Sequence, residues 1–237
     1  MKGKSIAVAK INFRNIKSAY IISAIVIGAI VIQDIVFVIL QSFGVSAGGE
    51  GNMTVSLGNY LFLLLLLSAI FIPSRNFRKM MNLGGKRADF FKGCAINLVI
   101  MSAVISLAGV ILYFTYDRLM IAVLYTGGTL DVLYWFGWLS DGPIVAFFRQ
   151  FAFLLLLSAF VHTLVSAQDK WYGWVADILI VAIISVFTPI APLRSALVWF
   201  FNMIITHSNA LVQILSCLIL ATAVYLLNKP ILARKVI

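Results

Sequence analysis

The residue types that carry most enzyme chemistry are rare in this chain and lie far apart. His162 and His207 are the only histidines, and Cys94 and Cys217 are the only cysteines. No HExxH pattern or cysteine cluster with the spacing of a zinc site is present. Both cysteines fall in apolar runs, where a packed thiol is commoner than a disulfide. The sequence therefore predicts no metal site, and we expect His162 to be a hydrogen-bonded packing residue.

Nucleotide chemistry is also unsupported by any complete motif. Gly3-Lys4-Ser5 matches the end of a phosphate-binding loop, but that motif needs another glycine five residues earlier and a strand before it. We therefore expect no catalytic residue and no cofactor in this chain itself. Dispersed carboxylates such as Asp34, Asp131 and Asp141 are the remaining candidates for acid–base chemistry, which leaves an enzyme open as an alternative.

Composition determines what must surround these residues. The 237 residues are 62% apolar and only 11% charged, with a mean hydropathy of +1.06. A soluble core of this size could not bury so many apolar side chains, so lipid is the expected solvent. The backbone of a segment that crosses lipid must satisfy its own hydrogen bonds. The chain is therefore predicted to be an all-α, polytopic membrane protein forming a single domain over residues 1–237.

Six apolar runs are close to the roughly 20 residues that a helix needs to cross a bilayer. Two of them carry a charge, Arg149 in the fourth and Asp177 in the fifth. The runs are residues 19–40, 55–73, 94–113, 144–166, 174–190 and 211–227. Segments 118–142 and 188–208 are interrupted by glycine or proline and by charges, and their aromatic residues suit a membrane interface. We expect these two segments to be re-entrant hairpins on the outer side.

The distribution of lysine and arginine gives the orientation. With six spans and both termini in the cytoplasm, every basic residue except Arg118, Arg149 and Arg194 lies on the cytoplasmic side, as the positive-inside rule requires. Counting one interrupted segment as a further span would place the basic C-terminal tail outside. The expected location is the cell membrane. Residues 1–18 have apolar side chains at helical spacing, among them Ile6, Ala9 and Phe13, and are predicted to form an amphipathic helix at the interface.

The first cytoplasmic loop, residues 74–92, has more order than a tether needs. Phe77, Met80, Met81 and Gly84 fall on one face of a short helix, whereas Arg78 and Lys79 point elsewhere. Gly84-Gly85 is expected to end this helix, and Asp89 to be the N-cap of the third span. A basic loop that only fixes topology would not need a methionine face. That face is suited to docking in an adaptable groove of a partner protein.

The stretch RNFRKMMNLGGKRADFFKG resembles the segment that joins the second and third spans of ABC-2 type permeases, the membrane subunits of ATP-driven exporters. The matching residues are Arg78, Leu83, Gly84, Arg87, Asp89, Phe90, Phe91 and Gly93. The layout is similar over nearly the whole chain, with an amphipathic N-terminal helix, six spans and a broken outer hairpin before the last span. In size the chain resembles permeases of Gram-positive exporters for peptides such as phenol-soluble modulins.

The resemblance implies a coupling helix that docks on a separate ATPase subunit, which binds ATP and Mg²⁺. The coupling residues would be Phe77, Arg78, Lys79, Met80, Met81, Gly84, Arg87 and Asp89. It also implies a second permease copy, identical or related, and no nucleic-acid partner. The expected function is outward transport of amphipathic or hydrophobic cargo, such as a peptide. The alternative is a non-transporting membrane protein, either an immunity or assembly factor or an intramembrane enzyme.

Ionisable residues inside spans are costly and should have partners. Asp34 and Arg149 lie at similar depths below the outer ends of spans one and four, so we expect them to pair, within the chain or across a subunit boundary. The alternative is that Arg149 extends to the outer headgroups. Asp177 lies near the cytoplasmic edge of span five. We expect it to anchor that edge through Lys170 or an arginine of the 74–92 loop.

Overall fold

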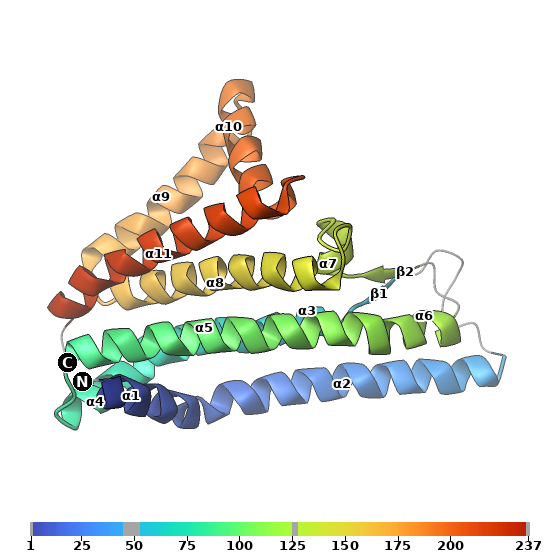
Figure 1. Cartoon of the computed structure of the whole chain (residues 1–237), viewed down its shortest axis with the longest axis horizontal. Helices are drawn as coiled ribbons and strands as arrows, with labels where there is room; N and C mark the ends of the chain where they lie inside the picture. The colour runs from blue at the N-terminus through green and yellow to red at the C-terminus, as the bar shows by residue number, and fades with distance from the viewer. Residues whose placement is uncertain (1, 45–52, 125–127, 236–237) are drawn as a thin grey trace.

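The computed structural model describes residues 2–44, 53–124 and 128–235, and these are almost entirely helical (Figure 1). The elements are α1 (Lys2–Asn15), α2 (Lys17–Ser42), β1 (Met53–Val55), α3 (Leu57–Phe71), η1 (Ile72–Asn76), α4 (Phe77–Asn82), α5 (Arg87–Leu112), η2 (Tyr113–Asp117), α6 (Arg118–Leu124), β2 (Gly128–Leu130), α7 (Val132–Trp135), α8 (Pro143–Ala167), α9 (Trp171–Phe187), α10 (Ala191–Phe201), η3 (Asn202–Thr206) and α11 (Ala210–Arg234). The three η elements are single-turn π-helices inside or at the ends of α-helices.

Five helical stretches are long and apolar enough to cross a membrane. They are Lys17–Ser42, Leu57–Asn82, Arg87–Val123, Pro143–Ala167 and Ala210–Arg234. Helix α9 and the α10–η3 segment pass the same test only as a pair, and they are bent by 118° relative to each other. The prediction of an all-helical chain with several membrane-length apolar helices is confirmed.

The third predicted span is much longer than its apolar core. Helices α5, η2 and α6 form one stretch of 37 residues from Arg87 to Val123, which at about 1.5 Å per residue is roughly 55 Å long. The prediction that a hairpin begins at residue 118 is therefore wrong for its first part. Residues 118–124 continue the helix instead, because nothing in RLMIAVL breaks it. Gly127, the first glycine of the expected break, lies outside the described residues.

Helices α3, α5, α8 and α11 form a bundle, whereas α2 and the α9–α10 pair have few buried residues. Helix α8 packs along both α5 and α11, and α3 packs against α5 and α8. Helix α2 lies beside α3 with most of its surface exposed. Helices α9 and α10 diverge from the bundle, and α10 buries no residue (Figure 1). Large apolar faces of α2, α9 and α10 are therefore left for lipid or for another protein.

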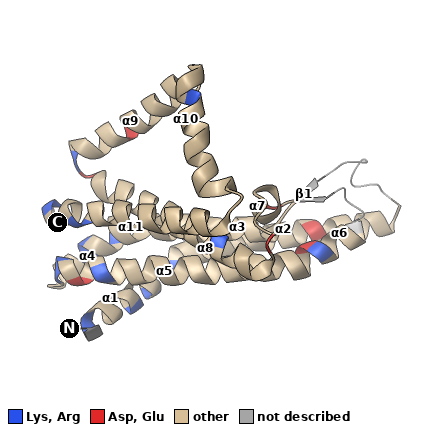
Figure 2. Ribbon diagram, turned by 45° about the horizontal axis from the view of Figure 1, so that its top comes forward, with Lys and Arg blue, Asp and Glu red and all other residues tan. Residues whose placement is uncertain are grey.

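The two ends of the bundle differ in charge. Helix α1, helix α4, the connection between α8 and α9, and the C-terminal end of α11 meet at one end, together with both chain termini (Figure 1). Most of the lysines and arginines are also there (Figure 2). We refer to this part of the molecule as the basic end and to the opposite part as the distal end.

At the distal end, two short strands join segments that are far apart in sequence. Strands β1 and β2 pair in parallel, and the Asn59 side chain donates to the backbone oxygen of Leu130 over 2.7 Å. Ser56 donates to Asp117 over 2.6 Å. Asp131, predicted as part of a break, accepts from the backbone N–H of Leu133 and caps α7. The distal end is thus ordered by carboxylates that accept hydrogen bonds from hydroxyl and backbone groups.

Helix α1 is packed into the bundle, and its buried face matches the predicted apolar stripe except at Ile6. Val8, Ala9 and Ile16 are buried, whereas Ile6 is 60% exposed. The helix lies along α5, where a Cβ atom at Gly93 would come within 2.5 Å of the Val8 side chain. The lack of a side chain at position 93 therefore lets α1 pack directly on a span. Its position at the membrane interface stays a prediction.

Candidate functional site

The 74–92 loop is the strongest candidate for a functional surface. Its central element is helix α4, which follows directly on η1. Helix α3 continues through η1 into α4 without a break, and η1 begins next to Pro73. Proline lacks the N–H that an α-helix would use, and a π-helical turn accommodates the defect. The second predicted span therefore extends past its apolar run, and α4 is a direct continuation of the α3 helix.

The methionine face of α4 is directed into the protein. Phe77 is fully buried and Met81 is 8% exposed, while Met80 packs against the same apolar cluster. Phe77 contacts Phe90 edge to face, with ring centroids 5.2 Å apart. The amphipathic turn was predicted, but its proposed use for docking a partner is wrong, because this chain's own α1, α5 and α11 already cover it.

The surface of α4 that another molecule can reach is basic and carries one apolar side chain. Arg78, Lys79 and Asn82 are exposed, and Leu83 at the C-cap is 86% exposed. Leu83 is thus an apolar side chain that the fold presents to the exterior at the tip of the basic end. We call the exposed residues Arg78, Lys79, Asn82 and Leu83 the α4 tip.

The glycine stop after α4 is confirmed. Gly84 has a φ of 76°, in the left-handed region that glycine adopts without strain. Its N–H donates to Met81 O over 2.9 Å, and the N–H of Gly85 donates to Met80 O over 3.0 Å. This pair of bonds is a Schellman motif, which satisfies the last carbonyls of a helix. It reverses the chain and exposes Leu83.

The start of α5 lies three residues before the predicted one, which is nearly one helical turn. The helix begins at Arg87 with Lys86 as its N-cap, and no side chain caps it. Asp89, predicted as the N-cap, lies in the first turn instead. A carboxylate there still opposes the positive end of the helix dipole, so the residue type suits the place although the boundary was wrong.

Arg87, one of the predicted coupling residues, binds within the chain. Its guanidinium donates to the backbone oxygen of Leu232 over 2.9 Å and also to that of Ala233. These are among the last carbonyls of α11, which have no partner inside the helix. Arg87 therefore fixes the beginning of α5 to the end of α11.

A second connection runs from α4 to the turn between α8 and α9. Arg78 Nη2 lies 3.8 Å from Asp169 Oδ1, and Lys235 Nζ lies 3.0 Å from Asp169 Oδ2. Lys235 is almost fully buried, and its Nζ lies 5.5 Å from the centre of the Phe77 ring. Asp169 was not among the predicted functional residues. The signal was a lone acidic residue between two apolar runs, on the side predicted to hold most of the cations.

Three buried asparagines join α1, η1 and α5. The side chain of Asn12 donates to Asn97 Oδ1 over 3.1 Å and accepts from Asn76 Nδ2 over 3.4 Å. Asn97 in turn donates to the backbone oxygen of Ala9 over 3.1 Å. This network was not predicted. Its signal was an asparagine within the apolar stripe of α1 and another within a span, since buried amides seek partners.

The predicted intramembrane charges have other partners. Asp34 accepts a hydrogen bond from the Tyr116 hydroxyl over 2.6 Å. Arg149 forms an ion pair with Asp141 at 2.8 Å and also donates to Ser208 O. Asp34 and Arg149 are therefore not paired within the chain.

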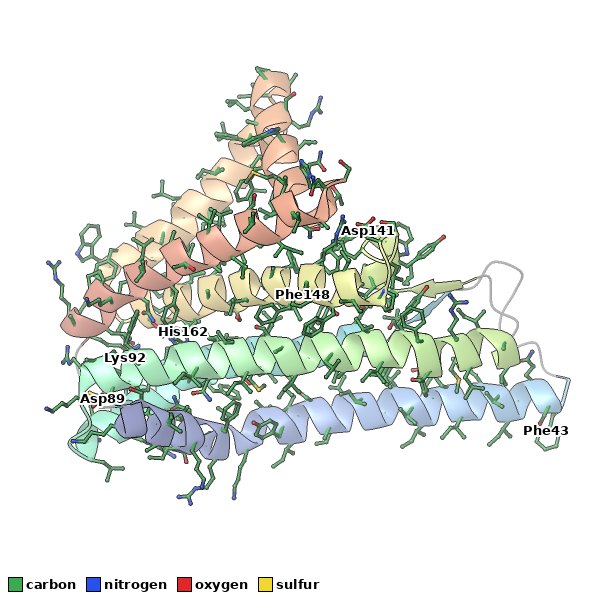
Figure 3. All side chains as sticks on the ribbon, in the orientation of Figure 1. Phe43, Asp89, Lys92, Asp141, Phe148 and His162 are labelled. Carbon is green, nitrogen blue, oxygen red and sulfur yellow. The ribbon has the colours of Figure 1, made fainter. Side chains whose placement is uncertain are left out.

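The remaining predictions concern Asp177, His162 and the cysteines. Asp177 accepts from Gln168 over 2.7 Å, and neither Lys170 nor an arginine reaches it. His162 is fully buried in α8 near the basic end (Figure 3), as a packing residue would be, and its hydrogen bonding stays a prediction. Both cysteines are buried and unpaired. In the described ranges no three His, Cys, Asp or Glu residues gather as metal ligands would.

Comparison with models of protein families, with curated proteins and with solved structures finds no match to this chain.

Proposed function

We propose that this chain is the membrane-spanning subunit of an ATP-driven exporter of the ABC-2 type. In this proposal the basic end lies in the cytoplasm with both termini. The chain crosses the membrane six times, with α9 as the fifth pass, and the segments within 118–142 and 188–208 lie at the outer surface. A separate subunit supplies ATP hydrolysis and binds the α4 tip.

The observation that carries the proposal is the way α4 is mounted. A short helix that receives force must be exposed on one side and rigidly attached on the other. The α4 tip is exposed, whereas Phe77 and Met81 anchor the same helix in the core. Its direct continuity with α3 means that a displacement of the tip would tilt a membrane-length helix.

The attachments spread such a displacement over the bundle. The asparagine network joins η1 to α1 and α5, and Arg87 joins α5 to α11. Asp169 joins α4 and the C-terminal segment to the start of α9. Buried polar networks of this kind hold one geometry because any other leaves an unpaired group. These contacts support a role in which movement at α4 changes the positions of several spans together.

The chemistry of the α4 tip specifies the partner surface. Arg78 and Lys79 favour an acidic surface, and Leu83 needs a small apolar pocket. The partner groove would therefore combine carboxylates with one apolar depression. The exposed apolar faces of α2 and α9 are consistent with a second permease copy, identical or related, with a hydrophobic or amphipathic peptide passing between the copies.

The test is to purify the tagged chain from its own membrane in mild detergent and to photolabel the co-purifying proteins with azido-ATP. We expect a labelled polypeptide that leaves the complex in the Lys79→Glu and Leu83→Asp variants. Lys79 forms no ion pair within the described residues, so its reversal changes the tip without breaking an internal contact.

The matched control is Lys10→Glu, which reverses an exposed lysine on α1 at the same end. It should leave the association unchanged. Thermal unfolding of every variant in detergent shows whether the membrane part is still folded. Absence of any labelled partner, or equal association of the Lys79, Leu83 and Lys10 variants, would overturn the proposal.

A further inference from the structure

A groove of about 590 Å³ opens on the side of the bundle near the basic end. Its walls are α5 and α11, its floor is α8, and α1 closes part of its basic end. Small side chains leave the space, with Ala95 on α5, Ala159 on α8 and Ala221 on α11 lining the groove. Helix α8 packs closely on both neighbours, whereas α5 and α11 meet over only a short distance. The hollow is therefore a consequence of three alanines at a three-helix junction.

The charged group of the groove lies toward the basic end, and the rest of the lining is mainly apolar. Lys92 and Ser5 lie at that end, while Val99 and Leu155 line the part farther along the helices. Thr222 lies farther along α11, where its hydroxyl donates to the backbone oxygen of Leu218 in the same helix. Figure 3 shows Lys92 at the basic end of α5. The Tyr225 hydroxyl, also in the lining, is already used, because it donates to the backbone oxygen of Phe91. This gradient from a cation to hydrocarbon matches an amphiphile.

Lys92 is available for a ligand. Its side chain is exposed, and it forms no ion pair in the parts of the chain that the structure describes. Lys4 is also exposed and directly precedes Ser5, so the charge at the mouth of the groove is positive. A cation beside an apolar hollow favours an anionic headgroup over a zwitterionic one.

The size of the groove argues against a protein helix as its occupant. A membrane-crossing helix is about 10 Å wide and about 30 Å long, which corresponds to roughly 2400 Å³. The groove holds only a fraction of this volume. On α5 it extends from Phe91 to Val99, which is about 12 Å along the helix axis. A single hydrocarbon chain is slender enough to place part of its length in a groove of this volume.

We propose that this groove binds one acyl chain of an anionic phospholipid, with the lipid phosphate at Lys92. The lipid belongs to the leaflet at the basic end, since the groove opens laterally where a bilayer would surround the bundle. The site does not depend on the exporter role. It requires only that the bundle is embedded in a membrane with its basic end at the headgroups.

Binding can be measured by native mass spectrometry of the delipidated protein with phosphatidylglycerol and phosphatidylcholine of identical acyl chains. We expect the first phosphatidylglycerol to bind more tightly than phosphatidylcholine. Because one lysine near an anionic surface contributes about 1 kcal/mol, Lys92→Gln should lower this preference about 5-fold. Lys10→Gln, on an exposed lysine outside the groove, should leave it unchanged.

A second variant tests the apolar part of the groove. Ala95→Leu fills the groove from a position that is only partly buried, so the fold should tolerate it. It should weaken the first binding event for both lipids, and thermal unfolding verifies that the variant is folded. An unchanged preference in Lys92→Gln, or unchanged binding in Ala95→Leu, would show that the groove is not the site.

Localisation gives an independent readout that needs no variant. Vesicles containing phosphatidylglycerol with a photoreactive diazirine on the acyl chain should crosslink mainly to residues 91–99 and 221–226. Crosslinks spread evenly over all lipid-exposed helices, α2 included, would contradict the proposal. A groove protected from crosslinking by another protein would contradict it as well, because the occupant would then be that protein.

Discussion

Arg149, a residue 2% exposed in the first turns of α8, forms its ion pair with Asp141, eight residues earlier in the chain. Figure 3 places Asp141 in the turn before α8. The same guanidinium nitrogen, Nη2, donates to the backbone oxygen of Ser208 over 3.1 Å. A single buried cation therefore joins the turn before α8 to the turn before α11, and both helices begin at this point.

Removing the anion should destabilise the protein. Asp141→Asn leaves a buried guanidinium with only a neutral partner, and we expect the free energy of unfolding to fall by about 1–3 kcal/mol. The measurement is the shift in Tm in detergent. The double variant Asp141→Asn, Arg149→Met should recover part of the loss, because an apolar side chain replaces the uncompensated charge. Equal Tm values for Asp141→Asn and the unmodified chain would contradict this role.

The depths of charged residues could be predicted from the sequence, but their partners could not. Asp34 and Arg149 were matched because both lie below the outer ends of their spans. Gly142 has a φ of 93° and turns the chain sharply into α8 directly after Asp141, which therefore lies close to Arg149. Asp34 reaches Tyr116 because the third span continues as a helix beyond its predicted end. Both outcomes depend on backbone geometry just outside an apolar run.

The role of Gly84 in ending α4 can be tested by substitution. Gly84→Ala places a Cβ in the left-handed region, which costs about 1–2 kcal/mol, and the Schellman bonds to Met80 and Met81 should weaken. We expect faster amide hydrogen exchange over residues 80–85. Gly28→Ala is the matched control, since Gly28 lies inside a helix with open space around its Cβ position. That change should be neutral or slightly stabilising, and faster exchange in both variants would refute the expectation.

The helix over residues 77–82 shows what the spacing of apolar residues can predict and what it cannot. The spacing of Phe77, Met80 and Met81 correctly predicted an amphipathic helix that ends at Gly84. Periodicity identifies an apolar face but does not tell whether the surface that covers it belongs to the same chain. Here α1, α5 and α11 cover it, and these contacts are between residues far apart in sequence. Leu83, the apolar residue that remains exposed, was noted only within the family resemblance.

Thiol reactivity tests the packing of two spans. Cys94 and Cys217 are both fully buried and unpaired. Neither should react with a maleimide reagent in the folded protein, whereas both should react after unfolding in sodium dodecyl sulfate. The count of added labels by intact mass gives the result directly. Rapid labelling of either cysteine under native conditions would show that the thiol on α5 or α11 is more accessible than this packing allows.

The asparagine network is the contact that should hold α1 against α5. Asn97→Ala removes the acceptor for Asn12 and the donor to the backbone oxygen of Ala9. Groups left unpaired in a buried site cost about 1–3 kcal/mol. Because α1 packs mainly on α5 and has few contacts with the other helices, the loss should appear there as local detachment.

Hydrogen exchange over residues 4–15, read by mass spectrometry, measures that detachment. We expect it to accelerate at least 5-fold in Asn97→Ala, while exchange in the middle of α8 stays slow. Ser102→Ala is the control on the same helix. Ser102 is equally buried, but its hydroxyl has no hydrogen-bond partner among the described residues, so its removal should leave α1 unaffected and should not lower Tm. If Ser102→Ala loosens α1 as much as Asn97→Ala does, the asparagine bonds are not what holds the helix.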